Sequence, residues 1–149
     1  MKKSILLALS VGFLTAVSAQ QHNNYKNFTV SVYVRAYEVR EMADLTKLET
    51  TWNGISQQVK VDKIYLETHR DKIIVDEKIL TAAKQFFESR GVEVAGGITY
   101  TMDERNHFET FCYSNPEHRQ KAREIAEYTA RHFDEFILDD FFFTSCKCD

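Results

Sequence analysis

The chain has 149 residues, a formal net charge of −3, 44% hydrophobic residues and 13% aromatic residues. This share of apolar and aromatic side chains is typical of a chain that forms a packed core, which excludes an intrinsically disordered protein. Because nucleic-acid binding needs a basic face and the chain is mildly acidic, we expect no nucleic-acid partner.

Residues 1–19 are predicted to be a secretory signal peptide. Two lysines precede a mostly apolar run at 5–17, and small residues end at Ala19, where cleavage is expected. The run is shorter than the roughly 20 residues of a membrane span, so we expect no span. The sequence therefore predicts one domain at 20–149 in a secreted or periplasmic protein.

Four strands and three helices are predicted to alternate along this domain. Runs of β-branched and aromatic residues predict strands at 28–37, 61–67, 92–101 and 136–140. Apolar residues three and four positions apart predict helices that begin near Asp44, Asp76 and Pro116. The order β-α-β-α-β-α-β indicates the α/β fold class, with a parallel sheet covered by helices.

Polar residues follow each predicted strand, at the end of the sheet where such folds place their chemistry. The candidates are Tyr37 after the first strand, Glu67, His69 and Arg70 after the second, Tyr100 at the end of the third, and Asp139 and Asp140 after the fourth. We therefore expect these side chains to meet at one edge of the sheet.

Asp139 and Asp140 end an apolar strand, where a partly desolvated carboxylate has a pKa that its surroundings can tune. Such a group suits a nucleophile, a general acid or a metal ligand. The alternative is structural: one aspartate caps backbone N–H groups and the other pairs with Arg70 or Arg105. Alternation along the strand predicts that Asp139 and Asp140 point to opposite sides.

The stretch D-E-F-I-L-D-D-F-F-F at 134–143 resembles the fourth-strand signature of bacterial exported glycosyl hydrolase-like TIM barrels. That signature reads approximately D-G-[I/V]-x-[F/L]-D-D-[Y/F]-[F/Y]-[Y/F], and Glu135 stands where the family usually has glycine. The resemblance implies the first half of a (β/α)8 TIM barrel. It also implies a catalytic or sugar-binding role for Asp139 or Asp140.

The leading hypothesis is an exported carbohydrate-active hydrolase that acts on a poly- or oligosaccharide without a cofactor. Glycoside hydrolysis uses two carboxyl groups that flank the scissile bond. Glu67 and Asp103 are candidates for the second carboxyl group, although it also comes from later strands in many such barrels. Tyr37 and Tyr100 are predicted to contact sugar, together with Glu67, His69 and Arg70.

Two alternatives stay open at this point. One is a metal-dependent hydrolase in which Asp139, Asp140, Glu67 and His69 are the ligands. The other is a non-catalytic sugar-binding α/β domain. Metal analysis separates the first alternative from the leading hypothesis, and binding without hydrolysis indicates the second.

Three cysteines and the length of the chain lead to two further expectations. Cys146 and Cys148 are too close in sequence for an unstrained disulfide and supply too few ligands for zinc, so they resemble the start of a cluster with later partners. A closed barrel takes about 250 residues. We therefore expect a fragment that lacks the carboxy-terminal half of the barrel and is inactive alone.

Overall fold

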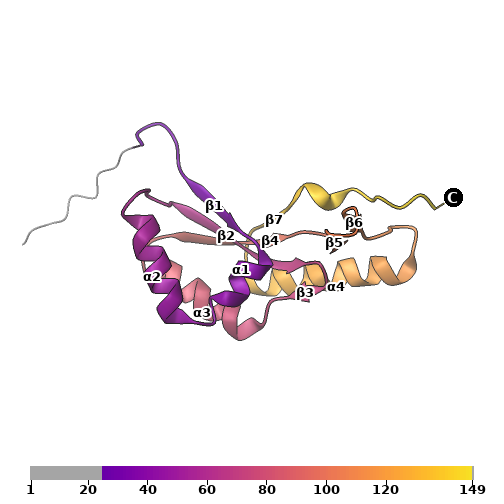
Figure 1. Ribbon diagram of the computed structural model, residues 1–149, viewed down its shortest axis with the longest axis horizontal. Helices are drawn as coiled ribbons and strands as arrows, with labels where there is room; N and C mark the ends of the chain where they lie inside the picture. The colour runs from indigo at the N-terminus through magenta and orange to yellow at the C-terminus, as the bar shows by residue number, and fades with distance from the viewer. Residues whose placement is uncertain (1–24, 149) are drawn as a thin grey trace, which may run out of the picture.

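The computed structural model describes residues 25–148, so the predicted signal peptide lies outside the described part. Its main sheet contains four parallel strands in the order β1-β2-β4-β7, so that the order in space follows the order along the chain (Figure 1). A short strand, β3 (Ile73–Ile74), pairs antiparallel with the end of β2. The parallel strands are β1 (Ser31–Val34), β2 (Lys63–Arg70), β4 (Glu93–Ile98) and β7 (Phe136–Leu138). The α/β fold class is confirmed.

Three long helices connect these strands: α2 (Leu45–Ser56), α3 (Glu77–Glu88) and α4 (Pro116–His132). The side chain before each helix accepts hydrogen bonds from backbone N–H groups of the first turn, and these caps are Asp44, Asp76 and Asn115. Such caps satisfy amides that have no partner within the helix. The predicted helix starts are therefore confirmed. Within residues 25–148, no helix is long and apolar enough to cross a membrane.

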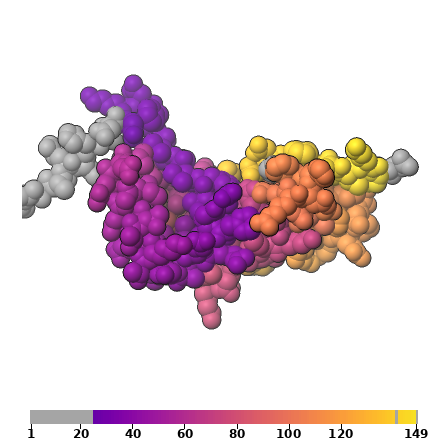
Figure 2. All heavy atoms as spheres, viewed as in Figure 1, coloured from indigo at the N-terminus to yellow at the C-terminus, as the bar shows by residue number. Residues whose placement is uncertain are grey.

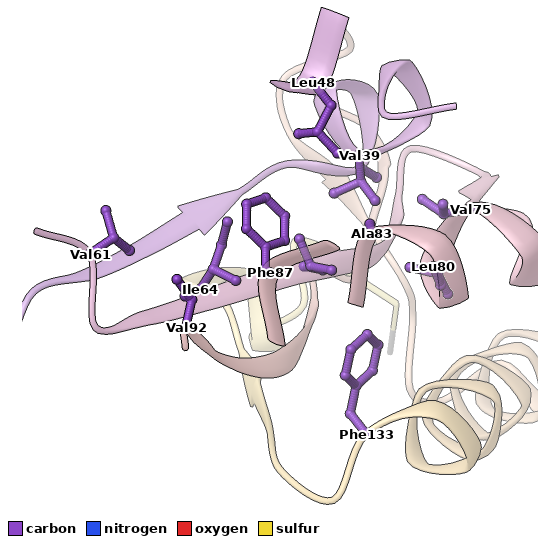
Figure 3. Close-up of a cluster of buried hydrophobic side chains, with 12 residues drawn as sticks. Val39, Leu48, Val61, Ile64, Val75, Leu80, Ala83, Phe87, Val92 and Phe133 are labelled. Atoms are coloured by element: carbon purple, nitrogen blue, oxygen red, sulfur yellow. The ribbon is translucent and has the colours of Figure 1, made fainter. Parts of the chain in front are cut away.

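The helices lie on one face of the sheet and bury the main hydrophobic core there (Figures 1 and 3). Ile64 and Leu66 of β2 meet Leu80 and Phe87 of α3 in this core, and all four are 3% exposed or less. Burial of each such side chain contributes roughly 1.5–3 kcal/mol. A Cβ at Gly96 would lie 2.8 Å from the Phe133 side chain, so the glycine permits the end of α4 to pack closely on β4.

The opposite face of the sheet, which we call the uncovered face, carries no α-helix of the described residues (Figure 1). Tyr33 and Tyr65 stack on it with ring centroids 6.5 Å apart. A Cβ at Gly97 would lie 2.7 Å from the Tyr33 hydroxyl, so the glycine leaves room for that tyrosine. At the amino-terminal end of this face, the Lys63 ammonium lies 2.8 Å from Glu93 and 2.7 Å from Glu135.

The prediction of a first strand at 28–37 is wrong at both ends. The strand stops at Val34, and a short helix, α1 (Ala36–Glu41), follows it. The backbone N–H of Ala36 donates to a carboxylate oxygen of Glu67 at 2.6 Å, a contact 31 residues apart in sequence. This long-range bond holds the chain where it leaves the sheet. Strand propensity describes only local sequence, so it does not predict such a contact.

The third and fourth predicted strands are also shorter than expected. The chain after β4 forms a hairpin of β5 (Thr101–Asp103) and β6 (Glu109–Thr110). The chain after β7 forms a 3-10 turn, η1 (Asp140–Phe142), with Asp139 as its cap. The strand alternation that predicted the direction of Asp140 therefore ends before that residue.

Candidate active site

A polar network of Tyr33, Glu67, Arg70, Thr99 and Asp139 occupies the uncovered face at the carboxyl ends of the strands. Residues three apart on a regular strand point to opposite faces, yet Glu67 and Arg70 contact each other. The pairing register of β2 with β4 shifts between Glu67 and His69. A bulge re-aims the side chains that follow it, and this one brings Arg70 to the same side as Glu67.

Glu67 is fully buried, and donors from its own chain occupy both carboxylate oxygens. One oxygen accepts from the Tyr33 hydroxyl at 2.7 Å, from Arg70 Nη2 at 2.9 Å and from the Thr99 hydroxyl. The other accepts from the Ala36 N–H and from Arg70 Nε at 2.8 Å. The two bonds from Arg70 form a bidentate pair, which is the strongest geometry for such an interaction. Glu67 thus anchors the network to β1, β2 and β4.

Arg70 joins three carboxyl groups from different parts of the chain. In addition to Glu67, its Nη2 donates to Asp139 Oδ2 at 2.9 Å and its Nη1 contacts Glu104. Burial acts to lower the pKa of Arg70, but the hydrogen bonds and negative charge of Glu67, with the charge of Asp139, raise it overall. Arg70 is therefore a permanent cation that fixes the position of Asp139.

The hydroxyl of Thr99 lies between two of these carboxylates. It is close to Glu67, 3.0 Å from Asp139 Oδ2, and accepts a hydrogen bond from Arg70 Nη2 at 2.9 Å. A hydroxyl has one proton, so Thr99 donates to Glu67 or to Asp139 but not to both at once. Its donor bond can therefore switch between the two carboxylates without movement of the backbone.

Asp139 is held in place but remains accessible, with 25% of its side chain exposed. Its Oδ1 accepts from the backbone N–H of Asp140 at 3.0 Å. Burial acts to raise the pKa of Asp139, but the bonds from Asp140 and Thr99 and the charge of Arg70 outweigh it and lower the pKa. Asp139 is thus an ionised carboxylate at neutral pH. It fulfils both parts of the structural alternative, because it caps a turn and pairs with Arg70.

Burial and nearby negative charge both act on the hydroxyl of Tyr33. Burial, followed by the charge of Glu67, raises the pKa of the Tyr33 hydroxyl far above its usual value. Three carboxyl groups converge on the single guanidinium of Arg70, so negative charge exceeds positive charge within this contact set. Such a site favours a ligand or transition state that carries positive charge.

The other predicted site residues lie in different surroundings. His69 is buried, and its Nδ1 lies 2.7 Å from the Thr99 carbonyl oxygen, to which it donates. Tyr100 is buried and donates to the Ala122 carbonyl oxygen at 3.0 Å. Tyr37 is exposed and donates to Asp71 at 2.6 Å, and Asp140 is exposed on η1. Contact of these residues with sugar stays a prediction.

Sequence reasoning missed Tyr33, Thr99 and Glu104 as members of the network. It considered mainly residues after the strand ends, whereas Tyr33 lies inside β1. Tyr33 pairs with Tyr65 in register, and Glu67 follows two residues later on the same side. Strand alternation applied to both strands was the signal that could have found Tyr33.

The sequence is similar to a protein family and to a known protein. A family model described as "Probable glycosyl hydrolase, catalytic domain" matches residues 17–149. An uncharacterized protein of Saccharolobus solfataricus is 32% identical over 133 residues, which cover 83% of this chain and 22% of the relative. The chain thus spans 22% of the length of that relative. No solved structure matches the chain significantly. Because the family match extends over most of the sequence, this chain belongs to the family of probable glycosyl hydrolase catalytic domains.

Proposed function

We propose that the protein hydrolyses glycosidic bonds in a poly- or oligosaccharide, with the carboxyl ends of β2, β4 and β7 forming part of the active site. Membership of the glycosyl hydrolase family supports the reaction class. The observation that carries the proposal is the position of Asp139, an accessible carboxylate whose pKa is lowered at the strand end where α/β enzymes place their chemistry.

The sheet is proposed to be the first half of a (β/α)8 barrel. Its parallel strands follow chain order and its helices all cover one face, as the outer helices of a barrel do. The uncovered face carries stacked layers, with Lys63 at one end, tyrosines in the middle and Arg70 at the other end. The remaining strands would belong to a longer protein, and this chain corresponds to 22% of its relative.

Asp139 is proposed to be the ionised carboxylate beside the reacting sugar carbon. The transition state of glycoside hydrolysis resembles an oxocarbenium ion, so an anion held close to it acts as a nucleophile or stabilises the positive charge. Arg70 donates to Oδ2 and the Asp140 N–H donates to Oδ1, so the carboxylate has one defined orientation whether or not Thr99 donates to it. Glu67 and Arg70 are positioning residues for it.

Asp140 is proposed to bind substrate from the rim of the site. It opens the turn η1 directly after Asp139 and is exposed. Glu67 is fully buried and chain donors occupy both of its oxygens, so we do not propose it as the group that protonates the leaving group. The candidates for that role are a carboxyl group of a later strand and Asp103 of β5, whose Oδ1 accepts from the backbone N–H groups of Arg105 and Asn106. The metal-hydrolase alternative has no support from the ligand geometry: within residues 25–148, no group of three potential metal ligands includes Asp139, Asp140, Glu67 or His69.

The experiment tests the protein on a panel of aryl glycosides and polysaccharides. Asp139→Asn and Asp140→Asn are compared with Asp134→Asn, an exposed aspartate before the same strand β7. We expect Asp139→Asn to lower kcat/KM by about 100-fold or more and Asp134→Asn to leave it unchanged. Asp140→Asn should act mainly through KM. Full activity in Asp139→Asn would remove the proposal.

We also propose that the protein is exported, as the first nineteen residues suggest. Mass spectrometry of the protein from the culture medium or periplasm should find Gln20 as the first residue. An intact Met1 in the exported protein contradicts the proposal.

A further inference from the structure

Three cysteines from two distant segments come together beside the active-site loop. The sulfur atoms of Cys112, Cys146 and Cys148 all lie within 4.8 Å of one another, although 34 residues separate Cys112 from Cys146. Cys112 precedes α4, and the other two follow η1. The Cys-x-Cys pair therefore has a third cysteine as a partner from earlier in the chain, which the sequence pattern did not indicate.

The spacing of the sulfurs fits a shared metal ion better than a disulfide. A Zn–S bond is about 2.3 Å, so two thiolates of a tetrahedral zinc ion lie about 3.8 Å apart. Cys112 Sγ and Cys148 Sγ are 3.4 Å apart. A disulfide requires about 2.05 Å between sulfurs and joins only two of three cysteines. A hydrogen bond between two thiols also fits the 3.4 Å spacing, but a shared metal ion accounts for the approach of all three sulfurs at once.

Protein contacts already hold the two segments next to each other (Figure 2). The backbone N–H of Ser145 donates to the Thr110 hydroxyl at 2.8 Å, and the Thr110 N–H is 3.3 Å from the Ser145 hydroxyl. The Tyr113 hydroxyl donates to the Phe142 carbonyl oxygen at 2.7 Å. These bonds lie on both sides of Cys112 and just before Cys146, so the sulfurs approach one another as part of a packed region.

We propose that Cys112, Cys146 and Cys148 form a structural site for a thiophilic divalent cation, and that zinc is the ion bound. Zinc takes four ligands and binds cysteine thiolates at structural sites. The three sulfurs provide three ligands, which leaves the fourth position to a water molecule or another small ligand. His107 and His118 line a hollow beside Cys112 and Cys146, but His118 Nδ1 already accepts a hydrogen bond from the Cys112 N–H at 3.0 Å. The ion would fasten the segment after Asp139 and Asp140 to the start of α4. It therefore stabilises the loop that carries the proposed active-site carboxylates without contact with substrate.

The first test measures zinc in the full chain. The protein is purified in reducing buffer, supplied with zinc and freed of excess metal, and zinc per chain is measured by native mass spectrometry. We expect one zinc ion per chain, and a loss of at least about tenfold in zinc affinity for Cys112→Ser and Cys148→Ser, since even an outer partner of a ligand is worth that much. Lys147→Ala, between the two cysteines, is the matched control and should retain zinc.

A second measurement does not depend on how the variants fold. Zinc should protect all three thiols of the unaltered protein from alkylation, and a chelator should remove the protection and lower the melting temperature. The proposal is overturned if the reduced protein binds no stoichiometric zinc, if the serine variants bind it as well as Lys147→Ala does, or if zinc leaves the alkylation rates unchanged.

Discussion

The two ends of the uncovered face hold the same kind of charge cluster in different surroundings. At the amino-terminal end, the Lys63 side chain is 15% exposed and lies between Glu93 and Glu135, whose side chains are 66% and 56% exposed. At the carboxyl end, Arg70 lies between Glu67, Glu104 and Asp139, and its own side chain is 6% exposed. Water therefore screens the charges of the first cluster, whereas burial largely excludes water from the second. The comparison shows how burial converts a common surface arrangement into one that can orient a reacting group.

The largest expected effect follows from removal of the buried cation. Arg70→Met leaves Glu67 buried without its bidentate partner, so we expect the free energy of unfolding to fall by about 3–5 kcal/mol. Lys63→Met at the other end should cost about 1 kcal/mol or less, because exposed ion pairs contribute little. Urea unfolding of both variants measures the difference.

Equal losses in the free energy of unfolding for Arg70→Met and Lys63→Met would contradict the proposed difference between the buried and the exposed cluster. High salt provides a control, since it should weaken the contribution of Lys63 and leave that of Arg70 nearly unchanged.

A smaller effect is expected where the backbone makes room for Tyr33. Gly97→Ala places a Cβ 2.7 Å from the Tyr33 hydroxyl and ring, so the tyrosine must move away from Glu67. We expect the free energy of unfolding to fall by about 1–3 kcal/mol, as is typical of overpacking. Thermal or urea unfolding measures this loss.

Gly54→Ala is the matched control for this substitution. Gly54 lies in α2, where an added Cβ meets nothing within 4 Å. Alanine there should stabilise the helix by up to about 1 kcal/mol. A neutral Gly97→Ala would show that Tyr33 is not confined by the sheet.

The smallest expected effect concerns acid stability. The pKa values of Asp139 and Glu135 are both lowered, Glu135 chiefly by its hydrogen bond from Lys63. A carboxyl group with a lowered folded-state pKa stabilises the protein above its unfolded value of about 4, and the gain is lost as the pH falls through the folded value. Asp139→Asn and Glu135→Gln should each flatten the loss of stability between about pH 5 and pH 3.

Salt distinguishes the two groups in this experiment. At about 1 M salt, where the Debye length is about 3 Å, the effect of Glu135→Gln should become clearly smaller and that of Asp139→Asn should change little. Unfolding in urea at each pH and salt concentration measures both. The same salt response for the two variants would show that Asp139 is as solvated as Glu135.

Prediction from sequence succeeded where neighbouring residues determine the structure. Asp44, Asp76 and Asn115 cap helices because each side chain accepts from amides two or three positions along. Gly91 follows α3 with a φ of 75°, a conformation that glycine adopts at little cost. Apolar periodicity likewise predicted which helix faces contribute Leu80, Ala83 and Phe87 to the core.

The site depended on contacts that sequence spacing does not show. A shift of register within β2 brought Arg70 to the side of Glu67, and the packing of the last segment on β6 and its neighbours brought Cys112 to Cys146 and Cys148. The sequence alone determined the alternation of strands and helices and the position of Asp139 at a strand end, because these follow from local periodicity and capping. Only the tertiary structure decided which donors surround Asp139 and which sulfurs meet, because those pairs lie tens of residues apart and come together through packing of the whole chain.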